Sequence, residues 1–327
     1  MSKLNVSIAV RAYNQEKEIK KALDSILMQQ CNFDIEVVIG VDLSTDDTIK
    51  VVQLYIDEAP ENIHYVPIFH KQSLGGPANM VSVLKKCSGK YIAWLDGDDY
   101  WNDSQKLTKQ VNIMEHDSSI GVVYSDDYFE STALEKTVIR NKDTLKGNIF
   151  TQMLSGCPIT SETALFRTDL LEFVEFDVFL EKRFEIDDYF LWLELTNHTK
   201  FHHLKELTST ACLTRQTICD ENVPLMSAEY DRLATNIRLF YLEKYPTKTL
   251  LSKVNIEDRH YQVFLKAALM CHNKKTAIDN LKKIVNKNNY QQLLFLLFKI
   301  PYGFDFYMLY RKLKGKDSKS LYERYFF

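Results

Sequence analysis

The chain has 327 residues, of which 45% are hydrophobic and 26% charged, a composition that fits a globular protein of one large or two smaller domains and excludes a disordered chain. Its formal net charge of −3 hides an asymmetry, because residues 241–327 contain 17 Lys and Arg against 7 Asp and Glu and leave residues 1–240 acidic. An acidic front part of this size would repel phosphate backbones, so we do not expect a nucleic-acid partner.

The six cysteines are scattered without a Cys-x-x-Cys pair, which argues against a zinc site and against a dense disulfide framework. Reduced thiols in a cytosolic protein are the simplest explanation. The N-terminus lacks the apolar core of a signal peptide, and no run of about 18 apolar residues predicts a membrane-spanning helix. We therefore expect a cytoplasmic protein.

Strand and helix signals alternate through residues 1–125. Apolar residues at helical spacing begin near Ile19 and near Ile49, and two glycines followed by Pro77 open a third helix. Ser44 resembles the N-cap of the second of these helices. Repeated βα units of this length predict a parallel sheet with right-handed crossovers. The expected strands are residues 6–10, 35–39, 63–69 and 91–95.

The rest of the chain divides into a less regular part and a helical part. Residues 126–225 show few clear periods, apart from a helix that begins near Asp187 and ends near Leu195. From about Ser227 apolar residues recur at helical spacing. The predicted domains are residues 1–225, which carry the motifs, and residues 226–327, a helical and basic C-terminal region.

Residues 95–101 (LDGDDYW) carry three carboxylates within four positions, directly after an apolar run. Like charges this close raise one another's pKa and repel unless a cation joins them. Mg²⁺ or Mn²⁺ relieves that cost, because the ion shares oxygen ligands with phosphate groups. Ligands of open α/β sheets bind at the carboxyl ends of strands, so the turn predicts a metal-assisted phosphate site. An acidic turn in solvent is the alternative.

Four stretches in this order resemble the glycosyltransferases of family 2, which have the GT-A fold. They are residues 6–16, 42–46, 95–101 and 187–192, and the first three each follow a predicted strand. The resemblance implies an α/β, Rossmann-like fold whose mostly parallel sheet is flanked by helices, with a helical C-terminal extension. It also implies transfer of a sugar from a nucleotide-sugar donor to a hydroxyl group.

The resemblance implies that residues after the first strands bind the donor. Asp42 would accept the imide N–H of uracil, and glycines at a helix N-terminus would admit the diphosphate. Val41 and Leu43 depart from the family pattern around Asp42. A turn acid at Asp42, a structural turn at Gly75 and a surface arginine at Arg215 are the alternatives. The implied donor-binding residues are Ala12, Tyr13, Asn14, Asp42, Gly75, Asn79, Asp96, Asp98 and Arg215.

Metal and acid–base roles follow from the same resemblance. Asp99 is the first choice as a Mn²⁺ or Mg²⁺ ligand, with Asp98 sharing the ion or contacting the ribose, and the ion would stabilise the departing diphosphate. Asp188 matches the family's catalytic position, where a carboxylate removes the acceptor's proton and the configuration inverts. Coupling to the adjacent Asp187 would raise one pKa of the pair. The alternative is an acid pair favoured at a helix N-terminus.

Two other polar pairs are interpreted as structural. Asp126 and Asp127 follow a further predicted strand at residues 120–124, and we expect a solvated loop there rather than an acceptor site. His202 and His203 lack the spacing of metal ligands and are expected to be strand residues.

The C-terminal region has an apolar and aromatic segment at residues 293–304, followed by basic residues at 311–316. Such a segment fits the surface of an anionic membrane. A terminal helix that packs on the domain, with its Lys and Arg in solvent, fits equally well. Both interpretations stay open.

We therefore predict a metal-dependent, inverting glycosyltransferase that uses a nucleotide-diphosphate sugar, with UDP favoured, and a glycan or lipid-linked saccharide acceptor in surface polysaccharide synthesis. A peripheral position at the inner face of the cell membrane is a further hypothesis. A catalytically silent nucleotide- or metal-binding module is an alternative, motivated by Val41 and Leu43. A sugar nucleotidylyltransferase is disfavoured because the loop after the first strand lacks glycine.

Overall fold

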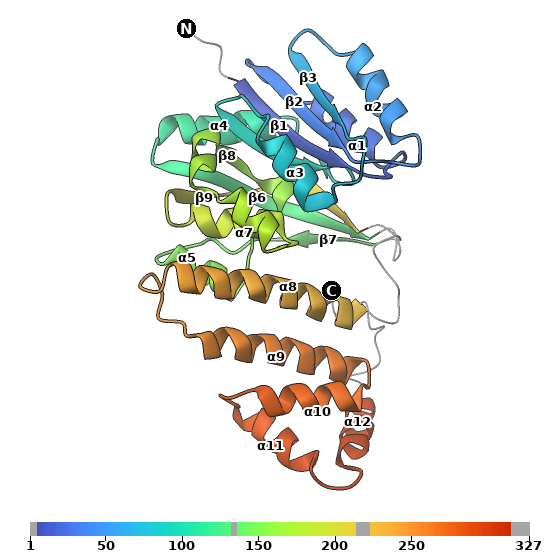
Figure 1. Ribbon diagram of the computed structural model, residues 1–327, viewed down its shortest axis with the longest axis vertical. Helices are drawn as coiled ribbons and strands as arrows, with labels where there is room; N and C mark the ends of the chain where they lie inside the picture. The colour runs from blue at the N-terminus through green and yellow to red at the C-terminus, as the bar shows by residue number, and fades with distance from the viewer. Residues whose placement is uncertain (1–4, 132–135, 214–222, 315–327) are drawn as a thin grey trace. The chain divides into compact units, whose positions relative to one another are not determined.

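The computed structural model describes residues 5–131, 136–213 and 223–314. The chain divides into two compact units, residues 1–214 and residues 215–327. In the described part of the first unit, nine strands form one mixed sheet (Figure 1). The strand order is β3-β2-β1-β4-β8-β6-β9-β5, and β7 pairs with β6. The strands are β1 (Asn5–Ala12), β2 (Asp34–Val41), β3 (Ile63–Phe69), β4 (Tyr91–Asp96), β5 (Tyr100–Trp101), β6 (Ile120–Ser131), β7 (Lys136–Arg140), β8 (Leu165–Arg167) and β9 (Lys200–Leu213).

The strands β3, β2, β1 and β4 run parallel, as the repeated βα units predicted. Val10 of β1 lies between Ile39 of β2 and Leu95 of β4, and all three side chains are fully buried in one core. Ala9 and Val38, which point to the opposite face, are buried as well. Burial on both faces explains why these strands read as continuous apolar runs.

Helices connect the strands and cover the sheet. Helix α1 buries Ile19, Leu23 and Ile26 in the core, as their spacing predicted. Helix α2 begins at Thr48 and is not capped by Ser44, because the Ser44 hydroxyl accepts a backbone N–H of the loop after β1 at 3.1 Å. The helices of this unit are α1 (Ile19–Leu27), α2 (Thr48–Asp57), α3 (Gly76–Leu84), α4 (Lys106–His116), α5 (Ile149–Ser155), α6 (Phe176–Glu181) and α7 (Asp187–Leu195), with 3-10 turns η1 (Ser161–Thr163) and η2 (Thr168–Phe173).

The second half of the sheet is more regular than its sequence indicated. Strand β8 pairs antiparallel with both β4 and β6, and β9 pairs parallel with β6 from Ile120 to Ser131. Because β6 continues to Ser131, Asp126 and Asp127 lie within a strand and not in the loop that we expected. Helix α7 belongs to the crossover between β6 and β9, which places its N-terminus beside the parallel strands.

The second unit is helical in its described residues, as predicted. One core unites α9 to α12 through residues such as Leu265, Leu281, Leu294 and Phe304. No helix in the described ranges is long and apolar enough to cross a membrane. The predicted boundary at 225/226 falls within α8. The helices are α8 (Val223–Lys244), α9 (Lys253–Met270), α10 (Lys274–Lys283), α11 (Asn289–Leu297) and α12 (Gly303–Leu313).

Candidate active site

A pocket of about 270 Å³ opens at the carboxyl ends of β1, β2 and β4. The parallel register makes this edge, because Ala12 lies beside Val41 and Arg11 lies beside Asp96. A crevice at this edge is where open α/β sheets bind their ligands. Six of the residues predicted to bind the donor line it. The lining residues are Arg11, Ala12, Tyr13, Gln15, Asp42, Gly76, Asn79, Asp96 and Asp98.

Arg11 is the most connected charge in the pocket, and sequence reasoning gave it no role. Its Nε lies 2.8 Å from Asp96 Oδ1, its Nη2 donates to Asp96 Oδ2 at 3.0 Å, and its Nη1 pairs with Asp187. Burial by itself lowers the pKa of Arg11, but the carboxylates of Asp187 and Asp96 outweigh burial and raise that pKa above its ordinary value. One cation therefore joins the acidic turn after β4 to the start of α7.

The acidic turn places Asp96 and Asp98 in the pocket. Gly97 between them is tightly packed, because an added Cβ would lie 3.0 Å from the Arg11 carbonyl oxygen and would displace the end of the Gln15 side chain. Burial and the neighbouring Asp96 raise the pKa of Asp98 to about 6. Asp98 therefore loses its proton less readily than an ordinary aspartic acid, and a cation bound beside it would favour the ionised form.

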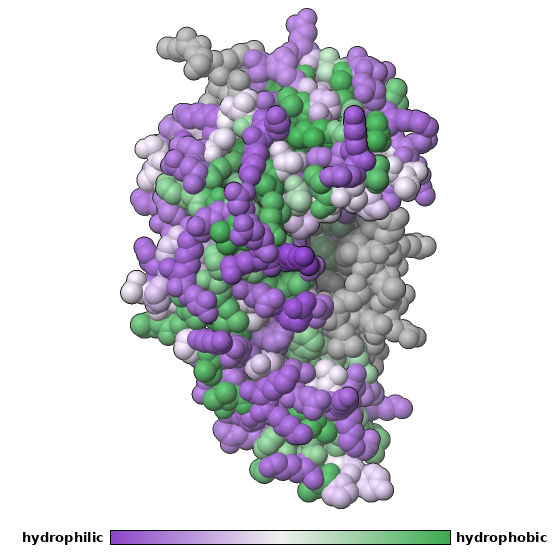
Figure 2. All heavy atoms as spheres, viewed as in Figure 1, coloured by the Kyte–Doolittle hydropathy of each residue, from purple (hydrophilic) through white to green (hydrophobic). Residues whose placement is uncertain are grey.

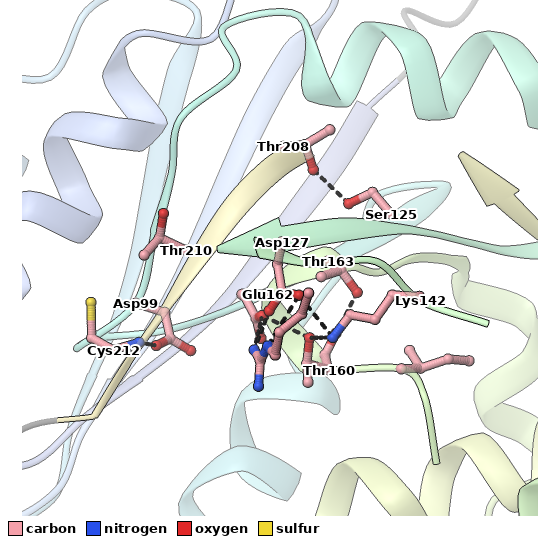
Figure 3. Close-up of polar contacts among 12 residues, drawn as sticks. Asp99, Ser125, Asp127, Lys142, Thr160, Glu162, Thr163, Thr208, Thr210 and Cys212 are labelled. Atoms are coloured by element: carbon pink, nitrogen blue, oxygen red, sulfur yellow. Dashed lines mark hydrogen bonds and ion pairs between the residues drawn. The ribbon is translucent and has the colours of Figure 1, made fainter. Parts of the chain in front are cut away.

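Asp99, our first choice as a metal ligand, does not line the pocket. Its side chain is buried and its Oδ1 accepts the Cys212 N–H of β9 at 2.8 Å (Figure 3). Burial, with Glu162 nearby, raises the pKa of Asp99 well above its ordinary value. The two neighbouring carboxylates therefore differ: Asp98 lines the pocket, and Asp99 contacts β9 in the second half of the sheet.

Asp127 lies in a buried ionic cluster instead of the expected solvated loop (Figure 3). Arg140 of β7 pairs with it, and Lys142 Nζ lies 2.9 Å from its Oδ1. Glu162 of η1 accepts the hydroxyl of Thr160 at 2.7 Å, and burial together with Asp127 raises its pKa to about 7. Buried charges of this kind must be paired, and these pairs tie β6, β7 and η1 together.

Asp126 and the two histidines are also accounted for within the fold. The side chain of His203 in β9 is only 3% exposed, its Nε2 lies 2.8 Å from Asp126 Oδ1, and its Nδ1 lies 2.8 Å from the Thr144 hydroxyl. The ring stacks on Tyr124 with 4.9 Å between centroids. His202 lies in the same strand, so the prediction that both are strand residues is confirmed.

The acid pair opens helix α7. Asp187 is buried and paired with Arg11, and its Oδ1 accepts the backbone N–H of Asp188 at 3.0 Å. The Asp188 side chain is half-buried, with its Oδ1 accepting the Tyr189 N–H at 2.7 Å. Burial and the adjacent Asp187 raise the pKa of Asp188 to about 7. The two acids therefore differ: one is held by a cation, and the other is poised to exchange a proton near neutral pH.

Asp42 is buried, and its oxygens are already occupied by the protein. They accept the backbone N–H groups of Leu74 and Gly75 at 2.9 Å, the N–H of Leu43 at 2.9 Å, and the Ser73 hydroxyl at 3.2 Å. Burial by itself raises the pKa of Asp42, but these donors lower it below its ordinary value. The carboxylate thus closes the loop before α3, which favours the turn-acid interpretation over a contact with the base.

We expect Asp42→Ala to lower the free energy of unfolding by about 1–3 kcal/mol, since buried N–H donors would lose their acceptor. Urea denaturation would measure this loss, and Ser73→Ala, which removes one hydroxyl donor, is the milder control. Because the pKa of Asp42 is depressed in the native state, its contribution is present at neutral pH and disappears as the pH falls below about 4. Unchanged stability of Asp42→Ala would contradict the structural role.

The other predicted donor-binding residues take several positions. Asn79 is buried, where its Nδ2 donates to the Gly40 carbonyl at 2.9 Å and its Oδ1 lies 3.0 Å from His70 Nε2. Asn14 ties its loop to the next one, because its Oδ1 accepts the Thr45 N–H at 2.8 Å. Gly75 has a φ of +80° at the N-cap of α3, which glycine adopts without strain. Arg215 lies outside the described residues.

The donor set of the pocket fits a hard divalent ion that arrives with a ligand. Within the described residues, no group of three or more His, Cys, Asp or Glu side chains could hold a metal by itself. Mg²⁺ and similar ions commonly use one or two carboxylates and complete their shell with phosphate oxygens and water. Asp98 faces the pocket outside the Arg11 ion pairs and would be the ligand of the ion. Asp96 lies next to it, with both of its oxygens bound to Arg11.

Comparison with known proteins identifies the family. Residues 7–174, just over half of the chain, match the model of glycosyl transferase family 2. The chain belongs to this family. The family 2 segment contains the pocket and the acidic turn, and it ends before the acid pair of α7.

Two curated relatives illustrate the similarity. An uncharacterized protein of Mycobacterium tuberculosis (strain ATCC 25618 / H37Rv) is 39% identical over 110 residues, which cover 34% of this chain and 31% of the relative. The matched part of this family 2 chain therefore spans about a third of the relative's length. The Escherichia coli enzyme WfaP, named a UDP-Glc:alpha-D-GlcNAc-diphosphoundecaprenol beta-1,3-glucosyltransferase, is 29% identical over 190 residues, covering 58% of this chain and 69% of WfaP.

Solved structures share the fold. Residues 1–349 of Staphylococcus aureus TarS, in complex with UDP, superpose with a TM-score of 0.57 at 17% identity, covering 95% of this chain and 92% of that one. The mannosyltransferase PcManGT of Pyrobaculum calidifontis, in complex with GDP-Man and Mn²⁺, has a TM-score of 0.53 at 15% identity, covering 98% and 87%. The predicted GT-A fold of this family 2 protein is thereby confirmed.

Proposed function

We propose that this family 2 protein transfers a sugar from a UDP-sugar to a hydroxyl of a glycan or lipid-linked acceptor, with inversion of configuration. One observation carries the proposal: the Arg11 guanidinium pairs with Asp96 in the pocket and with Asp187 at the start of α7. A pocket suited to a nucleotide diphosphate and an acid suited to take up a proton therefore lie next to the same side chain. Donor binding and proton removal need that proximity.

The donor would bind along the carboxyl ends of the parallel strands. The exposed ring of Tyr13 is available to stack on the base, and the start of α3 at Gly76 favours the negative diphosphate. Asp96 and Asp98 would hold the ribose and a Mn²⁺ or Mg²⁺ ion. The bound ion supplies Lewis-acid stabilisation of the departing diphosphate.

Asp188 would act as the general base. Its carboxylate takes the proton from the acceptor hydroxyl as the oxygen attacks the anomeric carbon, opposite the bond to the diphosphate. Attack from that side in one displacement inverts the configuration. A pKa of about 7 suits the role, because a general base works best when its pKa lies near the operating pH. Asp187, held by Arg11, would position the start of the helix.

The nature of the substrates is supported by the relatives. WfaP is named for a UDP-sugar donor and a diphosphoundecaprenol-linked acceptor, and TarS residues 1–349 have been crystallised with UDP-GlcNAc. We assign donor binding and catalysis to residues 1–225 and contact with a lipid-linked acceptor to residues 226–327. We further propose that the reaction takes place in the cytoplasm, in the synthesis of surface polysaccharide.

A UDP compound with Mn²⁺, at one hundred times its Kd, should stabilise the native state by about 2.7 kcal/mol and raise Tm by about 5–10 °C. A thermal-shift panel of nucleotides and nucleotide sugars, with and without Mn²⁺, measures this. Asp98→Asn should lose the Mn²⁺-dependent part of the shift, because it removes a charged oxygen ligand. Asp177→Asn, which changes an exposed acid of α6 outside the pocket, is the matched control.

Two outcomes would contradict the proposal in different ways. An unchanged Tm with every UDP compound would exclude a UDP-sugar donor and favour another nucleotide. A clear shift without any transfer or hydrolysis of the bound donor, over a panel of acceptors, would favour the catalytically silent module.

A further inference from the structure

Helix α11 carries two apolar faces instead of one. Its inner face packs Leu294 into the core of the second unit. Leu293 and Leu296 lie on the other side, where their side chains are 63% and 61% exposed. A helix that only packs on its own domain presents one apolar stripe and a polar opposite face. The second stripe on α11 is therefore not explained by the fold.

Helix α12 repeats this arrangement. Phe304, Tyr307 and Met308 are buried in the same core. Phe306, Leu309, Tyr310 and Leu313 recur at the spacing of a single helix face and are exposed, with 68% of Phe306 and 78% of Leu313 in contact with solvent. The turn between the helices adds Ile300 and Tyr302, both exposed. We call this set the outer band: Leu293, Leu296, Ile300, Tyr302, Phe306, Leu309, Tyr310 and Leu313.

The outer band lies among positive charges. Residues 274–314 contain nine Lys and Arg against two Asp. Lys299 follows α11, and Lys312 and Lys314 lie at the end of α12, where all three are exposed. On a helical wheel, Lys312 and Lys314 fall on opposite sides of the α12 stripe. Figure 2 shows hydrophobic and hydrophilic side chains interspersed over the part of the molecule formed by α10 to α12.

We propose that the outer band binds the surface of a lipid bilayer that contains anionic lipids. Its leucine and aromatic side chains would enter the boundary between headgroups and acyl chains, with tyrosines at the level of the headgroups and lysines on the lipid phosphates. The helices have 11 residues or fewer, so they would lie on the bilayer rather than cross it. A second copy of this chain is a poorer partner, because it would bring the same positive charge to the contact.

Vesicle flotation with the full chain tests the proposal. The protein should float with vesicles of phosphatidylcholine and phosphatidylglycerol, and should remain at the bottom of the gradient with phosphatidylcholine alone. The bound fraction should fall as salt is raised. This readout needs no donor, acceptor or turnover, so it is independent of the proposed enzymatic activity.

Two pairs of variants separate the contributions. Lys299→Glu with Lys312→Glu should weaken partitioning about 25-fold or more, since each lysine near an anionic surface contributes about fivefold. Leu309→Gln with Leu313→Gln should weaken it by at least about tenfold. Lys253→Glu and Leu250→Gln, which change exposed residues of the same unit outside the band, are the matched controls and should bind like the parent.

Three results would overturn the proposal. The first is equal recovery at the bottom of the gradient with both vesicle compositions. The second is flotation that the band variants and the control variants retain alike. The third is a dimer in sedimentation velocity that dissociates in Leu309→Gln with Leu313→Gln, because a second copy would then occupy the band. Circular dichroism of each variant would verify that the helices still fold.

Discussion

Asp188→Asn should lower kcat for sugar transfer by about 10²–10⁴-fold, the usual contribution of a general base. Asparagine keeps the size of the side chain and an oxygen that can accept the Tyr189 N–H, so the start of α7 should stay intact. The amide cannot take up a proton from the acceptor. Steady-state rates with a UDP-sugar and acceptor measure the loss, while the thermal shift with UDP and Mn²⁺ should be unchanged.

Wild-type kcat/KM should also rise with pH and reach half of its limiting value near pH 7. The reason is that burial and Asp187 raise the pKa of Asp188 to about 7, and the base acts only after it has lost its proton. Asp188→Asn should lose this dependence. Transfer activity within threefold of wild type in Asp188→Asn, with an unaltered pH profile, would exclude Asp188 as the base.

Arg11→Met should reduce kcat at pH 7 and move the pH profile toward higher pH. Arg11 lowers the pKa of Asp188, so its removal leaves that carboxyl protonated over a wider range. The same change leaves the buried carboxylate of Asp187 without its cationic partner. This loss should lower the free energy of unfolding by on the order of 2 kcal/mol. A full pH–rate profile and urea denaturation measure the two effects separately.

A double-mutant cycle with Asp187→Asn isolates this coupling. If Arg11 serves chiefly to neutralise Asp187, Arg11→Met with Asp187→Asn should be more stable than Arg11→Met alone. Arg11→Lys is the conservative variant: it keeps the charge but not the fork that reaches both carboxylates, and should recover part of the activity. If Arg11→Met lost stability but kept the pH profile of the wild type, the role of Arg11 would be structural only.

The parallel half of the sheet could be predicted because apolar runs that indicate strands alternate regularly with apolar residues at helical spacing. The predicted strand at 63–69 coincides with β3, and the other three lie within β1, β2 and β4. Buried parallel strands carry apolar runs that need no tertiary information to read. The second half could not be read in the same way, since β6 continues through Asp126 and Asp127, whose charge is neutralised by the distant Arg140 and Lys142.

Most residues of the pocket were predicted from the sequence, but the direction of their side chains was not. The spacing in residues 95–101 locates a cluster of carboxylates, yet it cannot tell which of them faces the ligand; the backbone turn directs Asp98 into the pocket and Asp99 toward Cys212. Arg11 was missed because it stands alone in an apolar strand. Its partner Asp187 is 176 positions away, and only the crossover between β6 and β9 brings the two together.

Strand β9 also limits how this protein could be divided. The family 2 segment ends at residue 174, but β9 lines the whole of β6, pairs with β5, and supplies the N–H that Asp99 accepts. A chain cut after that segment would expose two sheet edges and lose helix α7. A change of donor specificity would therefore require exchange of loops within an intact first unit, because the half that we propose to bind the nucleotide depends on β9 for its folding.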